Sequence, residues 1–525
     1  MWLRRLATDR IARRSPAPHD APLAVVATVD QALRITALND AAARLRLTAG
    51  MALADARAMY PGLPVADADP QADATLLVAV ADWCDRYTPL VGLDAPDGLV
   101  LDIAGCVHLF QNEMALARDL VRRLAMQGFA ARVAIADTVG CAWAMARYGD
   151  AVTIESGRQR DALAPLPLAA LRLSPDIVDT LAQVGLKRIA DVLDKPRAPM
   201  AARFGTAFIR AVDRALGQED EPIVPRLPVP AAIVERRFPD PIAYEDDVLG
   251  TIEHLARDLD RMLERRGEGA RVIQLALFRA DGQVHRLEIG TAAPLRDPVR
   301  IRRLFTDRLA ALGDACDPGF GYDMVRLSAL VTERTTPPQT GFAGDEAANE
   351  AELSHLIDRL GARFGLRRVT RLEPQDTHIP EFAVTPVPAH APRAHDPEKW
   401  APVFGKDHAQ KKKLPLPAHD FAQDTLAPPR PLRLFTRPEL IDVTALVPDG
   451  PPLRFRWRHL LHEVARAEGP ERIAMEWWHD MQGTPLTRDY FRIEDRGGMR
   501  AWLYREGLYS REVAQPRWFL HGLCA

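Results

Sequence analysis

The sequence predicts a multidomain protein of the α+β class, and three observations lead to this class. At 525 residues the chain is too long to fold around one hydrophobic core. In the N-terminal half, short apolar runs typical of strands alternate with stretches that have the three- and four-residue spacing of amphipathic helices. The C-terminal end is rich in aromatic side chains within short strand-like segments, which predicts a separate, small β-rich domain.

Composition excludes several classes of protein. No apolar stretch is long enough to cross a bilayer, and the basic segment at residues 1–15 lacks the apolar core of a secretion signal. The five cysteines lie far apart without a C-x-x-C pair, which argues against a zinc ribbon or a disulfide framework. We therefore expect a cytoplasmic, nucleoid-associated protein with no membrane contact, no metal and no cofactor. The net charge of −3 still permits a locally basic, nucleic-acid-binding face.

Residues 23–155 predict an α/β domain. Its buried strands are expected at 23–28, 98–103 and 131–136, and its amphipathic helices at 72–87 and 112–128. Asp97-Gly98 predicts the turn that opens the strand at 98–103.

Residues 166–218 predict short helices separated by Pro and Gly. Val184-Gly185-Leu186 matches the hydrophobic-Gly-hydrophobic turn with which helix-hairpin-helix modules bring backbone N–H groups to a phosphate. A plain helix-turn is the alternative, and the pattern alone favours it.

Residues 232–335 predict a βαββαβ domain. A strand and a long helix are followed by a hairpin around Ala280-Asp281-Gly282, a second helix at 298–312 and a closing strand at 324–331. This order implies a four-stranded sheet with both helices on one face.

After residue 335, the chain divides into a part with little predicted secondary structure and a C-terminal part with several predicted strands. One short helix is expected at 352–365, and the proline-rich residues 372–431 are expected to be largely linker. Near the C-terminus, RDYFRIED and MRAWLYREG flank Arg496-Gly497-Gly498 and predict antiparallel strands.

Three strings make a family resemblance specific: LNDAAARLRLTAGMALADARAMYP (38–61), PDGLVLDIAGCVHLF (96–110) and VAIADTVGCAWAMARYG (133–149). With the order of the domains, they resemble the Y-family DNA polymerases over about residues 1–335. The resemblance implies a polymerase-like right hand with a further domain: palm with fingers (1–165, fingers about 38–62), helix-hairpin-helix thumb (166–222), βαββαβ little finger (232–335), linker (336–430) and β-rich C-terminal domain (431–525).

The carboxylates that hold two metal ions in this family are largely replaced here. Alignment on the strand at 98–103 puts Asp97 at the first position of the paired carboxylates and Gly98 at the second. The expected first strand, MWLRRLA, has no acidic residue, and Asp9 falls after it. Because two-metal phosphoryl transfer needs several carboxylate oxygens, we expect no catalytic residue, only Asp97 as a vestige.

The residues that contact the triphosphate in this family are replaced as well. In the fingers the Tyr and Arg positions hold Asp40 and Ala43, and the lysine positions opposite hold Asp137, Val139 and Trp143. Acidic and apolar residues cannot hold a triphosphate, which favours a pseudo-polymerase.

The C-terminal strings RPLRLFTRPELI, RDYFRIED, WLYREG and RWFLHGL resemble those of ImuB-type proteins, the catalytically inactive branch of the family. The resemblance implies a damage-inducible adaptor for translesion synthesis. Its expected partners are primer-template DNA, a sliding clamp, a RecA-like accessory protein and an error-prone C-family polymerase.

Two segments are candidates for the clamp-binding peptide. Such peptides need a Gln followed by apolar anchors in an extended segment. Pro337–Phe342 supplies Gln339 and Phe342, with Gly341 in place of the usual Leu. Pro431–Phe435 has better anchors but no Gln, and the first strand of the C-terminal domain is the favoured interpretation.

Sequence-independent DNA binding is expected through phosphate contacts. The candidate contacts are Gly185 in the thumb and five arginines of the little finger, with solvated helix faces as the alternative: Arg236, Arg237, Arg300, Arg302 and Arg303.

Other motifs are weak. His459 and His462 would share one face of a helix, but no further ligand stands nearby, so a metal site is disfavoured. Gly319-Phe320-Gly321 lacks the third Gly of a dinucleotide fingerprint, and Trp477-Trp478 and Trp518-Phe519 favour packing shared with a partner surface.

An active polymerase of low efficiency is the alternative function. It needs a second carboxylate near Asp97, from Asp9, Asp94 or Asp102. Strand alternation should turn Asp94 and Asp102 away from Asp97, although a bend of the strand at Pro96 could bring Asp94 back. It could also draw on residues upstream of Met1, since the chain starts inside the expected first strand. A DNA-binding protein without a clamp link is a third possibility.

Overall fold

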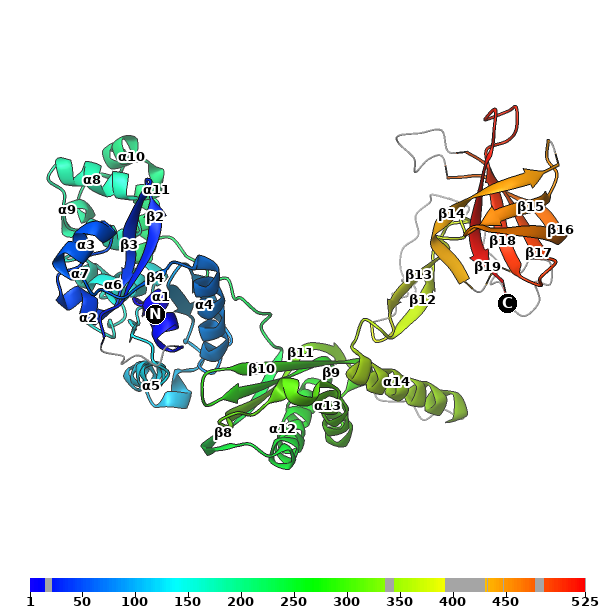
Figure 1. Ribbon diagram of the computed structural model, residues 1–525. Coiled ribbons are helices and arrows are strands. Elements are labelled where there is room, and N and C mark those ends of the chain that lie inside the picture. The colour runs from blue at the N-terminus through cyan, green and yellow to red at the C-terminus, as the bar shows by residue number, and fades with distance from the viewer. Residues whose placement is uncertain are drawn as a thin grey trace, which may run out of the picture. The chain divides into compact units, whose positions relative to one another are not determined.

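The computed structural model describes residues 1–14, 21–335, 344–391, 430–431, 433–446, 448–476 and 486–524. The chain forms two compact units, Met1–Leu366 and Arg367–Ala525, each described by itself below. Figure 1 labels the helices and strands of both units. Within the described residues, no helix is long and apolar enough to span a membrane.

The palm of the first unit is built on a four-stranded sheet of order β5-β6-β1-β7, in which β1 is antiparallel to both neighbours. Leu3, Leu99 and the apolar faces of α4 and α5 form its core. The palm elements are β1 (Trp2–Leu3), α1 (Leu6–Ala12), α4 (Pro70–Cys84), β5 (Val91–Asp94), β6 (Gly98–Leu101), η1 (Val107–Phe110), α5 (Glu113–Met126), β7 (Ala131–Arg132) and α6 (Val139–Tyr148).

The fingers form a separate three-stranded sheet of order β3-β2-β4 with its own core. The apolar run at 23–28, which we expected in the same α/β domain as the strand at 98–103, is β2 of this sheet. The finger elements are β2 (Ala24–Val29), β3 (Ala32–Leu38), α2 (Asp40–Arg44), α3 (Leu53–Met59) and β4 (Val65–Asp67).

The thumb is a cluster of short helices that share one core with α6 of the palm. Gly185 adopts φ +84° in the turn after α8, a conformation that favours glycine. The thumb elements are α7 (Gln159–Leu163), η2 (Leu168–Leu171), α8 (Pro175–Gln183), α9 (Ala190–Leu193), α10 (Arg197–Phe204) and α11 (Thr206–Leu216).

The little finger has the predicted βαββαβ order and a sheet of order β10-β9-β11-β8. Its two long helices lie on one face of this sheet and share a single core with it (Figure 1). Its elements are β8 (Ala232–Ile242), α12 (Glu245–Arg266), β9 (Glu268–Arg279), β10 (Val284–Leu295), α13 (Pro298–Leu312), η3 (Gly313–Cys316) and β11 (Tyr322–Arg334), followed by α14 (Gly344–Phe364), which is longer than the predicted helix.

The second unit is a closed six-stranded barrel with a hairpin packed on it. The hairpin of β12 (Thr370–Pro374) and β13 (Val384–Pro388) lies within the stretch that we expected to be linker. The barrel strands are β14 (Arg433–Ala445), β15 (Pro452–Trp457), β16 (Leu460–Ile473), β17 (Arg488–Asp495), β18 (Arg500–Glu506) and β19 (Arg517–Leu523). The predicted antiparallel strands are confirmed as β17 and β18.

The helix expected around His459 and His462 is wrong. Arg458 and His459 adopt φ +47° and +69° in the turn between β15 and β16, and His462 lies in β16. Two residues with positive φ form the tight turn that the twist of a hairpin requires. His462 places its Nδ1 2.7 Å from Asp495 Oδ2, so the two histidines are not a ligand pair.

Candidate functional site

The carboxylates of Asp94 and Asp97 converge at the hairpin between β5 and β6. Arg147, on α6, places its Nη2 3.1 Å from Asp94 Oδ2 and 3.0 Å from Asp97 Oδ1. Two indoles complete the cluster: Trp2 donates to Asp97 Oδ2 and Trp143 to Asp94 Oδ2, both at 2.8 Å. The Arg147 guanidinium also lies over the Trp143 ring, 4.1 Å from its centroid.

The expectation that strand alternation turns Asp94 away from Asp97 is wrong. Asp94 ends β5, and Asp97 precedes β6, so the two residues flank a tight turn and do not share one strand. Their carboxylates therefore meet, but the cation between them is a guanidinium of the protein. Charge-assisted hydrogen bonds of this kind are strong and compete with binding of an added cation.

Gly98, which replaces the second carboxylate of the pair, is packed too tightly to carry a side chain. A Cβ built on it would lie 2.8 Å from the Asp94 carbonyl oxygen and 2.9 Å from Arg147 Nη2, and closer still to Asp94 Oδ2. A glutamate at this position would have to displace the Asp94–Arg147 pair.

The first strand brings an indole to the site. In β1, Trp2 pairs with both Gly98 and Arg132, so it is the residue beside the Asp97 turn. Asp9 lies on α1, as the sequence predicted, and accepts a hydrogen bond from the Ala130 N–H at 2.8 Å. Burial raises the pKa of Asp9. Asp9 therefore supports the palm core and does not reach Asp97's cluster.

The two acidic replacements at the expected triphosphate contacts are both engaged. Asp40 forms ion pairs with Arg4 at 2.6 Å and Arg5 at 2.9 Å. Asp137 accepts hydrogen bonds from Ser156, Gly157 and Gln159, and the bond from Ser156 contributes most to lowering its pKa.

The remaining positions of that set offer no cation either. Val139 begins α6, Ala43 lies on α2, and Trp143 contacts Asp94. Within the described residues, no group of three or more His, Cys, Asp and Glu side chains is placed to hold a metal ion. The residues at this site do not fit the pair of divalent ions that the polymerase fold implies, because their carboxylates already bind Arg147 and two indoles.

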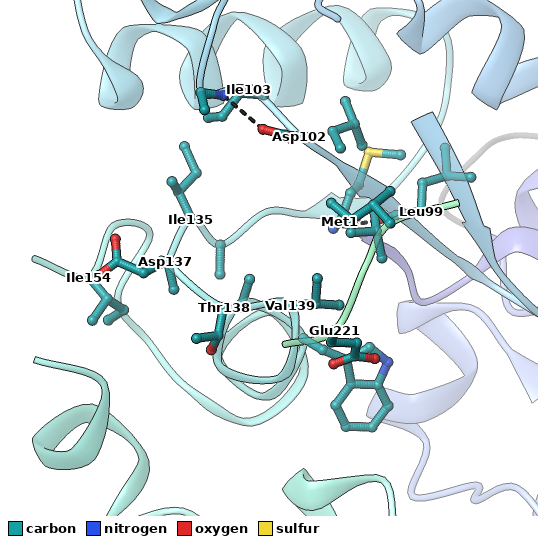
Figure 2. Close-up of a pocket in the computed structure, with 18 of the residues that line it drawn as sticks. Met1, Leu99, Asp102, Ile103, Ile135, Asp137, Thr138, Val139, Ile154 and Glu221 are labelled. Atoms are coloured by element: carbon teal, nitrogen blue, oxygen red, sulfur yellow. Dashed lines mark hydrogen bonds between the residues drawn. The ribbon is translucent and has the colours of Figure 1, made fainter. Parts of the chain in front are cut away.

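A cavity of about 690 Å³ lies next to this cluster, between β6 and the segment that follows β7. Figure 2 shows Leu99, Asp102 and Ile103 on one side, Ile135 across from them and Met1 at one end. Asp102, directly after β6, lines this cavity, and its Oδ1 accepts a hydrogen bond from the Ala104 N–H at 3.0 Å.

The predicted DNA-contacting arginines of the little finger lie on two faces of its sheet. Arg237 donates to the Arg86 carbonyl oxygen of the palm and pairs with Glu235. Arg236 lies over the Phe238 ring, and Phe238 packs against the core under the helices. The other three are exposed on α13, where Arg300 is near Asp297 and Arg302 is near Glu253: Arg300, Arg302 and Arg303.

A palm–little finger contact was not predicted. Arg286 of β10 pairs with Asp82 and Asp85 at the end of α4, and Arg226 of the connecting segment pairs with Asp82. Burial raises the pKa of Asp85 to about 6, against the effect of Arg286 and Arg226.

The same contact continues on β11. Arg326 donates to the Asp85 carbonyl oxygen at 2.7 Å and pairs with Glu235, and Arg86 pairs with Asp323 at 2.6 Å. Arg286, Arg326 and Asp323 lie more than 200 residues from the palm residues that they contact, so the sequence carries no local signal of these contacts.

The backbone N–H groups at the turn after α8 in the thumb already donate hydrogen bonds within the protein. The N–H groups of Gly185 and Leu186 donate to carbonyl oxygens of α8, and those of Lys187 and Arg188 donate to Asp191 Oδ2 at 2.8 Å each. A phosphate at this turn would have to compete with the Asp191 carboxylate, and the DNA role of Gly185 stays a prediction.

The clamp-peptide residues Gln339 and Phe342 lie outside the described residues, as do Trp477 and Trp478. In the second candidate segment, Leu434 and Phe435 belong to β14 and pack against the barrel cores, which confirms the interpretation as a strand. Trp518 and Phe519 lie in β19 and also pack in the barrel.

Comparison with known proteins shows which family shares this arrangement. The profile of the impB/mucB/samB family matches residues 8–147. Protein ImuB of Caulobacter vibrioides (strain NA1000 / CB15N) is 40% identical over 483 residues, which cover 90% of this chain and 98% of that protein. DNA polymerase IV of Desulfatibacillum aliphaticivorans is 22% identical over 295 residues, 53% of this chain and 72% of that protein.

Solved structures give a weaker likeness. DinB from Sulfolobus solfataricus has 15% sequence identity and a TM-score of 0.38, over 62% of this chain and 96% of that one. An insertion ternary complex of Dbh DNA polymerase has 14% identity and a TM-score of 0.39 over the same shares. The 40% identity across nearly the whole of both sequences is the decisive finding: this chain is a member of the ImuB family, with a Y-family polymerase-like fold followed by a β-barrel domain.

Proposed function

We propose that this protein is a non-catalytic, DNA-binding adaptor for translesion synthesis. The observation that carries the proposal is Arg147, whose guanidinium binds both carboxylates at the place where a polymerase of this fold needs metal ions. Gly98 supports it independently, because its surroundings exclude a second paired carboxylate. Asp137, whose hydrogen-bond donors among the described residues are all neutral, would also repel a triphosphate.

The partners belong to the same proposal and rest on the family. We infer that the chain binds primer-template DNA without sequence preference, through its palm, thumb and little finger. A sliding clamp, a RecA-like accessory protein and an error-prone C-family polymerase are the proposed protein partners, with Gln339 and Phe342 as anchors for the clamp.

Low polymerase activity is the alternative, and one observation favours keeping it. Asp94 and Asp97 do converge, so two carboxylates would face one point if Arg147 moved away. Two carboxylates without the third still leave most ligands of two hard cations to water and nucleotide.

Primer extension by the purified chain tests the proposal. The reactions contain Mg²⁺ or Mn²⁺ and four nucleotides, and compare the unchanged protein with Asp97→Ala and Arg147→Ala. We expect no extension by any of the three and retained binding of primer-template DNA, measured by fluorescence anisotropy.

The variants separate the alternatives. Extension by the unchanged chain that disappears in Asp97→Ala would overturn the adaptor proposal. Extension that appears only in Arg147→Ala would show that the guanidinium alone blocks an otherwise competent site, which also contradicts our account of Gly98.

A further inference from the structure

A second, smaller pocket lies in the thumb and is lined by arginine side chains. Its volume is about 260 Å³, and it lies where α11, η2 and the start of α6 meet. Apart from Leu171, its uncharged lining residues are glycine and alanine. The charged residues that line it are Arg172, Arg210, Arg214 and Glu221. A ligand in this pocket would therefore meet three guanidinium groups and one carboxylate.

The three guanidinium groups are held by two glutamates of the segment that follows α11. Arg210 Nη2 and Arg214 Nε both donate to Glu219 Oε1, at 2.6 and 3.0 Å. Arg172 Nη1 donates to Glu221 Oε1 at 2.6 Å. The hydrogen bond from Arg210 is the largest cause that lowers the pKa of Glu219. In this structure, two carboxylates thus occupy the positions that the oxygens of an anionic ligand would take.

The arginines keep donors for a further acceptor. Within the described residues, no hydrogen bond or ion pair involves Nη1 of Arg210 or Nη1 of Arg214. Asp220, between the two glutamates, is exposed and lines the larger cavity of about 690 Å³, which Glu221 also lines (Figure 2). The smaller pocket can therefore offer guanidinium donors before either glutamate moves.

A phosphate group suits these arginines better than the glutamates do. The planar fork of a guanidinium binds the oxygens of a carboxylate and those of a phosphate in the same way. A phosphate has more oxygens than a carboxylate and carries up to two negative charges, so one group can bridge several arginines. Here Glu219 serves Arg210 and Arg214, and a different glutamate serves Arg172.

The backbone at Arg172 supports a role for its side chain. Arg172 ends η2 with φ +58°, in the left-handed region that favours glycine. Its guanidinium lies over the Trp143 ring, 5.4 Å from the centroid. Residues held in such a conformation cluster at sites that bind ligands. An arginine where glycine would fit the backbone more easily indicates that the guanidinium is needed at this pocket.

We propose that the thumb pocket binds a phosphate group, and that Glu219 and Glu221 hold its arginines while the ligand is absent. On binding, Arg172, Arg210 and Arg214 exchange glutamate oxygens for phosphate oxygens. The phosphate belongs either to a free anion such as pyrophosphate or to the DNA backbone, since both present the same oxygens. The site uses none of the residues that we predicted to contact DNA, and its existence does not rest on the adaptor function.

Removing the two competing carboxylates tests the site. In the full chain, Glu219→Gln with Glu221→Gln keeps the side-chain size and removes both charges. We expect the affinity for pyrophosphate, measured by isothermal titration calorimetry, to rise by about ten-fold, because the arginines no longer exchange one charged partner for another. Asp161→Asn with Asp194→Asn is the matched control, since it removes two charges from exposed thumb ion pairs and should leave the affinity unchanged.

Removing two of the arginines gives the opposite expectation. Arg210→Gln with Arg214→Gln should lower the affinity for pyrophosphate by about ten-fold or more. Thermal unfolding checks that each variant folds, and exposed ion pairs of this kind contribute little to stability. The proposal is overturned if the glutamate variant binds pyrophosphate no better than the unchanged chain, or if the arginine variant binds it as well.

A second arm with primer-template DNA, followed by fluorescence anisotropy, identifies the source of the phosphate. If the glutamate variant also gains affinity for DNA and pyrophosphate competes with that DNA, the backbone supplies the phosphate. If its affinity for pyrophosphate rises while its affinity for DNA does not, the ligand is a free anion. Either result supports the pocket. A lack of DNA binding by the unchanged chain would contradict the proposed function and leave the pyrophosphate test of the pocket intact.

Discussion

At the scale of single residues, one arginine supplies the counter-ion for two carboxylates of the palm. Arg147 lies four positions after Trp143 on α6, so both side chains face the same carboxylates. Asp94 and Asp97 gain an internal counter-ion, and Trp2 and Trp143 each donate one further hydrogen bond. Through these contacts, each of the two carboxylates binds both the guanidinium and one indole.

Gly98 provides the prediction at this scale. Gly98→Ala places a methyl group against Asp94 and Arg147, and we expect a loss of about 1–3 kcal/mol in the free energy of unfolding. Gly98→Glu should be worse and should not create polymerase activity. Gly105→Ala is the matched control, since a Cβ there meets no atom within 4 Å.

Thermal unfolding of the three variants measures this effect. Equal stability of Gly98→Ala and Gly105→Ala would mean that the Asp94–Arg147 pair yields easily, and that the absence of the second carboxylate has no steric cause.

At the scale of elements, contacts between distant segments determine how the little finger is held. Arg286 of β10 and Arg326 of β11 reach the end of α4 across the face of the sheet that α12 and α13 leave open. Arg237, a predicted DNA contact, is engaged in the same region through the Arg86 carbonyl oxygen. DNA that uses this face must compete with the palm.

Removing Arg286 should loosen that contact. In Arg286→Ala, Asp82 and Asp85 lose their β10 partner, and burying carboxylates without a cation is unfavourable. We expect hydrogen exchange in residues 82–87 to rise by about ten-fold, with Arg265→Ala, exposed on α12, as the control. Unchanged exchange in Arg286→Ala would show that Arg226 and Arg326 hold the contact without it.

The barrel depends on a buried ion pair in the same way. Asp489 of β17 is fully buried and pairs with Arg505 at 2.6 Å and Arg472 at 2.7 Å. Although burial opposes ionisation, these hydrogen bonds lower the pKa of Asp489. Its stabilising effect is therefore present at neutral pH and is lost as the pH falls below the usual carboxyl range.

Asp489→Ala leaves Arg505 buried without this partner, and we expect a loss of about 3–5 kcal/mol in the stability of the second unit. Glu494→Ala, which removes an exposed partner of Arg500 on the same strand, should cost about 1 kcal/mol or less. Denaturant unfolding followed by tryptophan fluorescence compares them. Similar losses in both variants would contradict this account of the barrel.

At the scale of the whole molecule, the chain combines a polymerase-like first unit with a second unit built on a six-stranded barrel. The two candidate clamp segments differ in what they can offer a partner. Leu434 and Phe435 are packed in the barrel, so the second candidate segment could present these two anchors to a partner only by unfolding part of β14.

We predict that Gln339→Ala with Phe342→Ala lowers affinity for a purified sliding clamp by about ten-fold or more, since anchor residues dominate such interfaces. Surface plasmon resonance measures the affinity, and Pro337→Ala with Pro338→Ala serves as the control. DNA affinity should not change. An unaltered clamp affinity would favour the DNA-binding protein without a clamp link.

Much of the fold was predictable because its determinants are local. Strand alternation and helix spacing determine the βαββαβ order of the little finger and the strands β17 and β18, and these were confirmed. The hairpin at β12 and β13 was not predicted, because its prolines suit a linker equally well and its contact with the barrel, through Glu381 and Arg488, is not local.

The sequence alone determined which carboxylates are present. It places Asp97 at the first position of the paired carboxylates and Gly98 in place of the second. The tertiary structure alone decided what the remaining groups do. Whether Asp94 faces Asp97 depends on a turn, and whether Arg147 reaches both depends on the packing of α6 against the palm sheet. The sequence gives the identity of each residue directly. The distance between the charges of Arg147 and Asp97, which are 50 residues apart, is set only when the palm core folds and brings α6 next to the sheet.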